Sequence, residues 1–268
     1  MAYFISGKPE RIVCLTEEPT ETLYLLGEGA RVVGISAYTE RPPEARRDKP
    51  VVSAFIGGSV AKIKALAPDL VIGFSDIQAE LAKQLIAENL QVLIFNQRSV
   101  QEILDTILVL GRLVGANARA EQLVAGLIAR VEAAQQRAAT RGYRPSVYFE
   151  EWDAPMISAI QWVSELIELA GGRDVFAERA HGKLAKERFA TSEEVLARAP
   201  ELYLASWCGK AFDRASVLAR AGWDALPAVR SGELHELDPA IILQPGPACL
   251  TDGLDALEAI ISRYAGKR

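Results

Sequence analysis

Two acidic pairs are the residues of this chain best suited to catalysis. Glu17-Glu18 and Glu150-Glu151 each follow an apolar run of strand length. A glycoside hydrolase uses two carboxyl groups about 5 to 9 Å apart, one as acid and the other as base or nucleophile. Glu18 and Glu151 are therefore candidates for a hydrolase or transferase. The competing roles are solvated or docking carboxylates, or charges that stabilise the N-terminus of a following helix.

The other reactive side chains predict little chemistry. Cys208 follows an apolar run and lies close to Lys210, which would lower a thiol pKa, but Ala211 stands where a dithiol motif needs its second cysteine. We therefore expect Cys208 to pack or to line a site. His181 and His235 are far apart and have no companions at ligand spacing, so no metal site is expected.

Nucleotide-binding and hydrolase motifs do not occur in the sequence. Gly27, Gly29 and Gly34 follow a helical pattern at a spacing that does not fit a dinucleotide-binding turn, and they suit a helix stop instead. The sequence contains neither a phosphate-binding P-loop motif nor the G-x-S-x-G motif of serine hydrolases.

Composition restricts the class of protein. The chain has 268 residues, is 50% hydrophobic and 24% charged, and carries a formal net charge of -5 with both signs interspersed. Nucleic acid is therefore not an expected partner. The sequence has no uninterrupted apolar run of about 18 residues, so no membrane span is predicted. An odd set of three scattered cysteines suits a reducing compartment.

The first ten residues contain no apolar run of signal-peptide length. Two locations follow as expectations: the cytoplasm for the chain as written, or the periplasm for a trimmed mature form.

Alternating patterns predict a parallel α/β lobe over residues 1–116. Strand-like apolar runs alternate with helical spacing, as is typical of a sheet covered on both faces. The predicted strands are 11–15, 32–35, 51–52, 70–74 and 92–95, and the predicted helices include 22–26 and 77–89.

The alternation stops after this lobe. Residues 99–142 keep helical spacing with one interruption near 115–117. This long strandless segment argues against a βα-barrel. Residues 117–142 are predicted to form a single long backbone helix that joins two lobes as a rigid strut.

The second half resembles the first. Ala199-Pro200-Glu201-Leu202 repeats Ala67-Pro68-Asp69-Leu70 at an offset of about 132, and the acidic pairs recur at a similar offset. We therefore expect a second lobe over 143–268, with a helix from 163 to 170, a capping box at 191–194, a strand near 233–237 and a last helix from 252 to 264. The predicted fold has two Rossmann-like α/β lobes with parallel sheets and a ligand cleft between them.

Ligands of open parallel sheets bind beyond the carboxyl ends of the strands. Aromatic and polar side chains are predicted at these ends, and aromatic walls with a few polar groups suit a large planar ligand. Phe74 and Trp207 are also candidates for core packing. The predicted ligand-binding residues are Tyr38, Phe55, Phe74, Asp76, Glu151, Trp152, Trp207 and Gln244.

The chain resembles, essentially end to end, a family of non-enzymatic substrate-binding proteins. Three segments carry the likeness: RIVCLTEEPTETLYLLGEGARVVGISAYTERPPEA, ALAPDLVIG and EEVLARAPELYLAS. The family has two lobes joined by a helical backbone and delivers cobalamin, haem and iron-siderophores to ABC importers. The likeness is greatest to its cobalamin-binding members.

The resemblance implies a bound corrinoid and no catalytic cofactor. It sets Tyr38, Phe55 and Phe74 against the corrin, with Trp207 contributed by the second lobe, and Phe stands at two positions where Trp is frequent. Haem or a ferric siderophore is the alternative ligand. The rigid strut predicts that the two lobes close only slightly around the ligand, and this chain is expected to be a monomer.

One departure concerns the transporter. Family members carry a surface carboxylate on a first-lobe helix that pairs with the permease, but this chain has Ala61-Lys62 there. The resemblance therefore leaves docking to an ABC importer permease in doubt.

Overall fold

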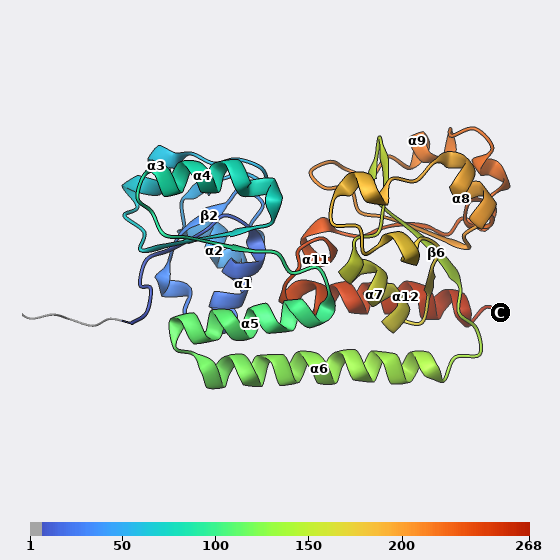
Figure 1. Ribbon diagram of the computed structural model, residues 1–268. Coiled ribbons are helices and arrows are strands. Elements are labelled where there is room, and N and C mark those ends of the chain that lie inside the picture. Colours follow the sequence, from blue (N-terminus) through green and yellow to red (C-terminus); the bar gives the residue numbers. More distant parts are fainter. Residues whose placement is uncertain (1–6) are drawn as a thin grey trace, which may run out of the picture. The chain divides into compact units, whose positions relative to one another are not determined.

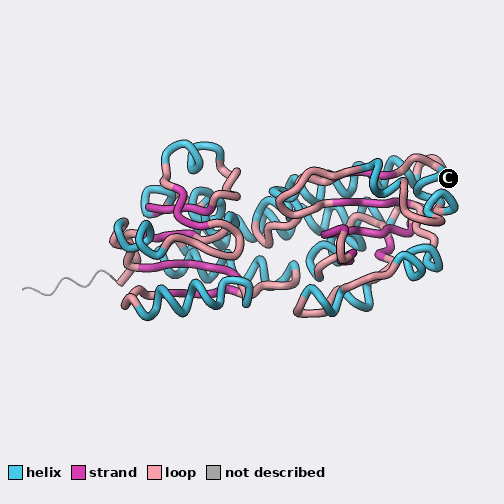
Figure 2. Tube along the Cα trace, turned by 90° about the horizontal axis from the view of Figure 1, so that it is seen from above, coloured by secondary structure: helices cyan, strands magenta, loops and turns pink. Residues whose placement is uncertain are grey.

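The computed structural model describes residues 7–268. It contains two compact units, shown in Figures 1 and 2, and each is described by itself. Unit 1 consists of the described residues up to Gln97 together with Gln101–Gly126. Unit 2 consists of Arg98–Val100 and Leu127–Arg268. The boundary falls inside the long helix α6 (Asn117–Ala139), which corresponds to the predicted backbone helix.

Unit 1 contains a five-stranded sheet in the order β3-β2-β1-β4-β5, and every neighbouring pair is parallel. The parallel α/β fold is confirmed. In chain order its elements are β1 (Ile12–Cys14), α1 (Glu17–Leu25), η1 (Gly29–Arg31), β2 (Val32–Ser36), α2 (Pro43–Asp48), β3 (Val51–Ser53), α3 (Val60–Ala65), β4 (Leu70–Phe74), η2 (Asp76–Gln78), α4 (Ala79–Ala87), β5 (Val92–Phe95) and α5 (Val100–Val114).

The strands of unit 1 are apolar throughout because helices cover both faces of the sheet. Side chains of a strand alternate between its faces. Ile12 and Cys14 of β1 therefore pack with residues of α1 and α5, whereas Val13 and Leu15 pack with residues of α3 and α4. Burial on both faces explains why the runs show no polar alternation.

The first helix begins earlier than predicted. The spacing predicts a helix from residue 22, but α1 begins at Glu17. Its first turn, Glu17-Glu18-Pro19, contains residues that helix N-termini tolerate or favour: acids interact well with the positive end of the dipole, and proline loses no helical hydrogen bond there.

Unit 2 contains a sheet in the order β10-β9-β6-β7, with β8 also paired to β6. Its elements are β6 (Ser146–Asp153), β7 (Met156–Ser158), α7 (Gln161–Leu169), β8 (Arg173–Asp174), η3 (Ala177–Arg179), η4 (Ala185–Arg188), α8 (Ser192–Arg198), β9 (Leu202–Ala205), α9 (Arg214–Leu218), η5 (Trp223–Ala225), α10 (Pro227–Arg230), β10 (Leu234–Glu236), α11 (Pro239–Ile242), the π-helical η6 (Cys249–Gly253) and α12 (Leu254–Ala265).

The sheet of unit 2 departs from the predicted parallel arrangement at one strand, β7. β6 pairs in parallel with β9 but antiparallel with β7. Glu150 and Glu151 were predicted to lie in a loop after the strand, and this prediction is wrong, because both belong to β6. Pairing with β7 extends the strand beyond the length of its apolar run.

The repeated segment has the same geometry in both units. Ala67 and Ala199 each have φ of 45° and each follow a helix that ends before a proline. The acidic residue then caps a neighbouring strand: the Asp69 carboxylate accepts the Arg11 N–H at 3.0 Å, and the Glu201 carboxylate accepts a backbone N–H at the start of β6 at 3.0 Å. This shared geometry supports the predicted relation between the two halves.

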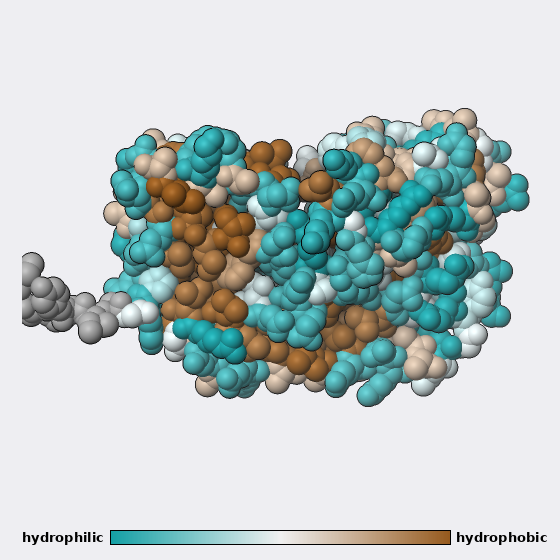
Figure 3. Space-filling view, viewed as in Figure 1, coloured by the Kyte–Doolittle hydropathy of each residue, from teal (hydrophilic) through white to brown (hydrophobic). Residues whose placement is uncertain are grey.

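Apolar surface is visible on unit 1 in Figure 3. Exposed hydrophobic side chains of this unit include Leu25, Tyr38, Ile56 and Ile86. Residues 7–268 contain no helix that is both long and apolar enough to cross a bilayer.

Glycine should be preferred at the two repeated alanines. A positive φ disfavours residues with a Cβ, and glycine removes that cost. We expect Ala67→Gly and Ala199→Gly each to raise the free energy of unfolding by about 0.5 kcal/mol, after the larger entropy of the unfolded chain is subtracted. Urea denaturation measures the change.

Ala129→Gly is the matched control. Ala129 is exposed in the middle of α6, where glycine should cost about 1 kcal/mol. Equal losses at all three positions would contradict the assigned backbone geometry.

Candidate ligand-binding site

The carboxyl ends of β2 and β3 present two aromatic rings. Tyr38 follows β2 and is 42% exposed, and Phe55 follows β3 and is partly exposed. Their ring centroids lie 6.2 Å apart with an interplanar angle of 81°. An edge-to-face pair with exposed surface at the strand ends can contact a flat ligand.

Two other predicted residues of unit 1 are placed differently. Phe74 ends β4 and is only 7% exposed, which agrees with the alternative of core packing. Asp76 is exposed and lines a shallow groove of about 410 Å³ beside α4, together with Lys83 and Ile86. The exposed Tyr38 and Phe55 are not among the residues that line this groove.

The acidic start of α1 holds the loop that carries Tyr38. Glu17, Glu18 and Glu21 are all buried, so solvated carboxylates are excluded for the predicted pair, and Glu17 and Glu18 lie in the first turn of α1, which agrees with the alternative of acids at a helix N-terminus. Glu17 Oε1 accepts the backbone N–H groups of Glu40 at 3.2 Å and Arg41 at 3.1 Å. The Arg41 side chain also donates to Glu21 at 2.8 Å. These contacts connect the loop after β2 to α1.

Burial favours the protonated form of two of these carboxyl groups. Desolvation raises the pKa of Glu17 to about 8, against the lowering effect of the Glu40 N–H, and raises the pKa of Glu18 to about 7. Oε2 of each residue is buried without a hydrogen-bond partner. A neutral acid tolerates such a position far better than a carboxylate does.

In unit 2 the fully buried Glu150 is the centre of a polar cluster. Arg220 donates to both of its oxygens at 2.7 and 2.8 Å, and Tyr203, Tyr148 and Trp207 donate at 2.7, 3.1 and 3.2 Å. Burial, with the charge of Glu150, raises the pKa of both tyrosines, which therefore remain donors. The cluster satisfies a charge that would be costly to bury alone.

Trp207 belongs to this cluster and to the core. Its side chain is only 2% exposed and packs edge-to-face on Phe212 at 5.2 Å. The sequence predicts Trp207 at a ligand surface, with core packing as the alternative. Its burial in this structure agrees with core packing.

Trp152 lies nearer the surface. It is partly buried in the β6–β7 hairpin, where Lys210 Nζ lies 4.7 Å from its ring centroid and 4.8 Å from that of Trp207. Lys210 also pairs with Asp153 at 2.5 Å. This cation–π arrangement orients Trp152 at the end of the hairpin.

The remaining candidate residues of unit 2 have different surroundings. Glu151 is paired with the buried Arg188 at 2.5 Å, which occupies the carboxylate proposed for catalysis. Burial, and next the charge of Glu151, raises the pKa of Cys208, whereas a reactive thiol needs a lowered one. Gln244 lies between α11 and η6, beyond a helical turn that the sequence did not predict.

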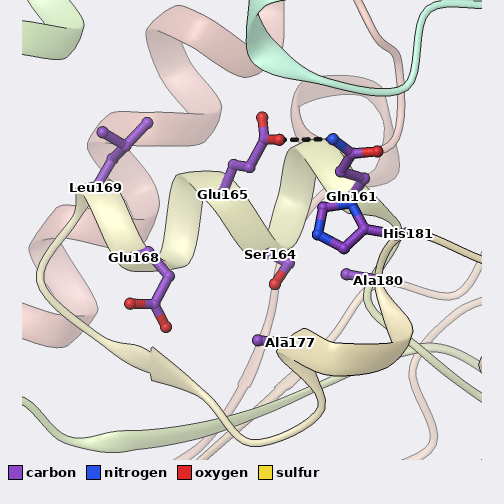
Figure 4. A pocket seen from close by; sticks show the side chains of 8 residues that line it. All are labelled: Gln161, Ser164, Glu165, Glu168, Leu169, Ala177, Ala180 and His181. Atoms are coloured by element: carbon purple, nitrogen blue, oxygen red, sulfur yellow. Dashed lines mark hydrogen bonds between the residues drawn. The ribbon is translucent and has the colours of Figure 1, made fainter.

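A second hollow lies beside α7 (Figure 4). Its volume is about 440 Å³, and its lining residues include Gln161, Glu165, Glu168 and His181. Glu165 accepts the Gln161 amide at 2.8 Å and the Val100 N–H at 2.7 Å, and Glu168 accepts the Asp174 N–H at 2.9 Å. Both carboxylates are therefore engaged in hydrogen bonds within the protein. Within residues 7–268, no group of three or more His, Cys, Asp or Glu residues could hold a metal ion.

The two arginines that pair with the acids of β6 could not be found from the sequence. Arg188 and Arg220 lie in segments without a motif, and their partners Glu151 and Glu150 are distant in sequence. Only the pairing of strands and loops brings them together, so no local signal could have identified them.

Removing the buried carboxylate should destabilise unit 2. Glu150→Ala leaves Arg220 without its partner, and breaking such a pair costs about 3 to 5 kcal/mol. We expect a loss of that order in urea denaturation and an altered tryptophan emission.

Asp255→Ala is the control, because the Arg130–Asp255 pair has side chains that are 41% and 51% exposed. It should cost less than about 1 kcal/mol. Similar losses for both variants would contradict a structural role specific to Glu150.

Stability should fall as the pH rises. The unfolded chain loses the Glu17 proton near pH 4.5, but the folded chain keeps it to about pH 8, so the folded state binds more protons in between. Glu17→Gln should therefore gain at least about 1 kcal/mol relative to the unchanged chain between pH 5 and pH 9.

The measurement is urea denaturation at both pH values. Glu121→Gln, on the exposed surface of α6, should show no such gain. A pH-independent difference for Glu17→Gln would show that the folded chain holds Glu17 ionised.

Known proteins are similar to this chain in sequence. The chain is 26% identical to an uncharacterized ABC transporter substrate-binding lipoprotein, YvrC, of Bacillus subtilis, over 94% of this chain and 80% of that protein. It is 28% identical to a vitamin B12-binding protein of Vibrio cholerae, over 94% and 87% of the two chains.

Solved structures share the fold. The periplasmic haem-binding protein RhuT of Roseiflexus superposes with a TM-score of 0.78 at 26% identity, covering 94% of this chain and 99% of that one. The periplasmic vitamin B12 binding protein BtuF of Vibrio cholerae gives a TM-score of 0.74 at 24% identity, covering 97% and 99%.

A family model described as periplasmic binding protein matches residues 12–241. Members of this family bind solutes for ABC transporters and are not enzymes, so the hydrolase hypothesis for Glu18 and Glu151 is set aside. The chain therefore belongs to the periplasmic binding protein family, in the group of ABC substrate-binding proteins of cobalamin, haem and siderophore type.

Proposed function

We propose that this chain binds cobalamin or a related corrinoid. The observation that carries the proposal is the exposed Tyr38–Phe55 pair at the carboxyl ends of β2 and β3. Rings at this edge of a parallel sheet offer apolar contact to a broad flat ligand. The vitamin B12-binding relatives support the choice of ligand.

Polar groups near the rings suit a ligand that carries amides. Glu40 lies in the loop after Tyr38 and is exposed. Its carboxyl group can accept hydrogen bonds from the amides of a corrin periphery.

Haem is the second candidate, for one specific reason. Tyr38 carries an exposed phenol, and tyrosine is a known axial ligand of haem iron. The haem-binding RhuT also shares the fold.

The proposal includes action as a monomer without docking through α3. Ala61 and Lys62 are both exposed there, and neither supplies the carboxylate that the family resemblance implies. A permease would have to engage another surface.

Titration with cyanocobalamin tests the ligand. Binding should quench tryptophan emission, and equilibrium dialysis should give a matching Kd. Phe55→Ala and Tyr38→Ala should each raise the Kd about 10-fold, equivalent to about 1.4 kcal/mol of lost ring contact.

Leu25→Ala is the control, because Leu25 is 53% exposed at the end of α1 and should leave the Kd unchanged. No response up to about 100 µM cyanocobalamin would contradict the proposal. Haemin binding with a Soret band that shifts in Tyr38→Phe would establish the haem alternative instead.

A further inference from the structure

A single glutamine bridges three strand-end segments of unit 1. Gln78 is fully buried at the end of η2. Its Oε1 accepts the Phe74 N–H at 3.0 Å, and its Nε2 donates to the carbonyl oxygens of Phe55 at 3.1 Å and Leu15 at 3.3 Å. Phe74 is the last residue of β4, Phe55 follows β3, and Leu15 follows β1.

The amide lies where a ligand crevice is expected. From β1 the chain proceeds to β2 and β3 on one side and later to β4 and β5 on the other, so the strand order reverses between β1 and β4. Loops diverge at such a switch point and leave a crevice at the carboxyl ends. Gln78 spans it by bonding to Leu15 on one side and Phe74 on the other.

The backbone of Gly73 packs closely against the Gln78 amide. A Cβ added at Gly73 would lie 2.6 Å from Gln78 Oε1, so a larger residue there would displace it. Both Nε2 hydrogens and the Oε1 acceptor have backbone partners, and burial makes each of these bonds costly to lose. A hydrocarbon side chain of similar size would leave the Phe74 N–H and the Phe55 carbonyl without this partner.

The backbone after Phe74 supports the same conclusion. Ser75 has φ of 55° and ψ of −178°, a region that residues with a side chain rarely adopt. The Ser75 N–H donates to Phe95 O at 2.7 Å, and Gln78 holds the preceding N–H. A strained turn persists only where its neighbours over-determine it.

We propose that Gln78 is a positioning residue of the binding site, which sets the placement of the segments that carry Phe55 and Phe74 and thereby determines ligand affinity. The inference rests on the proposed function for its ligand. Gln78 has no exposed surface, so it acts through these backbone groups without touching the ligand.

Affinity and stability separate this role from simple structural support. Gln78→Leu should raise the Kd for cyanocobalamin at least about 10-fold at a temperature where circular dichroism shows the chain fully folded. Leu85→Ala, which opens the core beneath the neighbouring helix α4, should lower the denaturation midpoint but leave the Kd unchanged. Equal Kd values for Gln78→Leu and the unchanged chain would overturn the proposal.

A conservative variant supplies the rescue. Gln78→Glu keeps the shape, but its carboxylate cannot donate to Phe55 O or Leu15 O. Protonation restores one donor, so the ratio of its Kd to that of the unchanged chain should shrink as the pH falls. A constant ratio from pH 8 to pH 5 would contradict the role assigned to the amide donors.

Hydrogen exchange of the ligand-free chain separates the two proposals. The Phe74 amide should exchange faster in Gln78→Leu than in the unchanged chain, whereas Gln84→Ala, on the exposed face of α4, should not change it. Faster exchange in a chain that binds no cyanocobalamin would refute the corrinoid proposal but keep Gln78 as the residue that holds the loops. Unchanged exchange would refute the positioning role whatever ligand binds.

Discussion

A buried polar side chain at the carboxyl ends of parallel strands joins distant segments in each unit. Backbone groups that leave the sheet ladder there but remain buried need another partner. In unit 1 the amide of Gln78 bonds to such backbone groups, whereas in unit 2 Glu150 bonds to the side chains of Arg220 and two tyrosines. In each unit one fully buried polar side chain connects segments that are distant in sequence.

This constraint decides which aromatic rings remain available to a ligand. Phe74 and Trp207 bond to the buried Gln78 and Glu150 and are themselves buried. Tyr38 and Phe55 lie further along their loops and keep exposed surface. The exposed aromatic surface at the carboxyl ends of β2 and β3 is therefore contributed by loop residues, whose placement depends on how the loops are held.

Several acidic side chains of the chain also form contacts within the protein. Glu17 and Glu18 were candidates for catalysis, for solvated or docking carboxylates, or for the N-terminus of a helix, and they are buried at the start of α1. Glu151 is neutralised by Arg188. A family of solute-binding proteins has no need for a free acid–base pair, and these carboxyl groups hold loops and strands in place.

The sequence by itself determined the fold class, because apolar runs and helical spacing reflect burial that each segment experiences wherever it packs. It also indicated the repeat, since Ala199-Pro200-Glu201-Leu202 matches Ala67-Pro68-Asp69-Leu70. Only the tertiary structure decided that Glu150-Glu151 continues a strand, that Trp207 is buried, that Gln78 bonds to three strand-end segments and that Arg188 and Arg220 pair with Glu151 and Glu150. These features depend on contacts between residues far apart in the chain, and such contacts leave no periodic or local pattern to read.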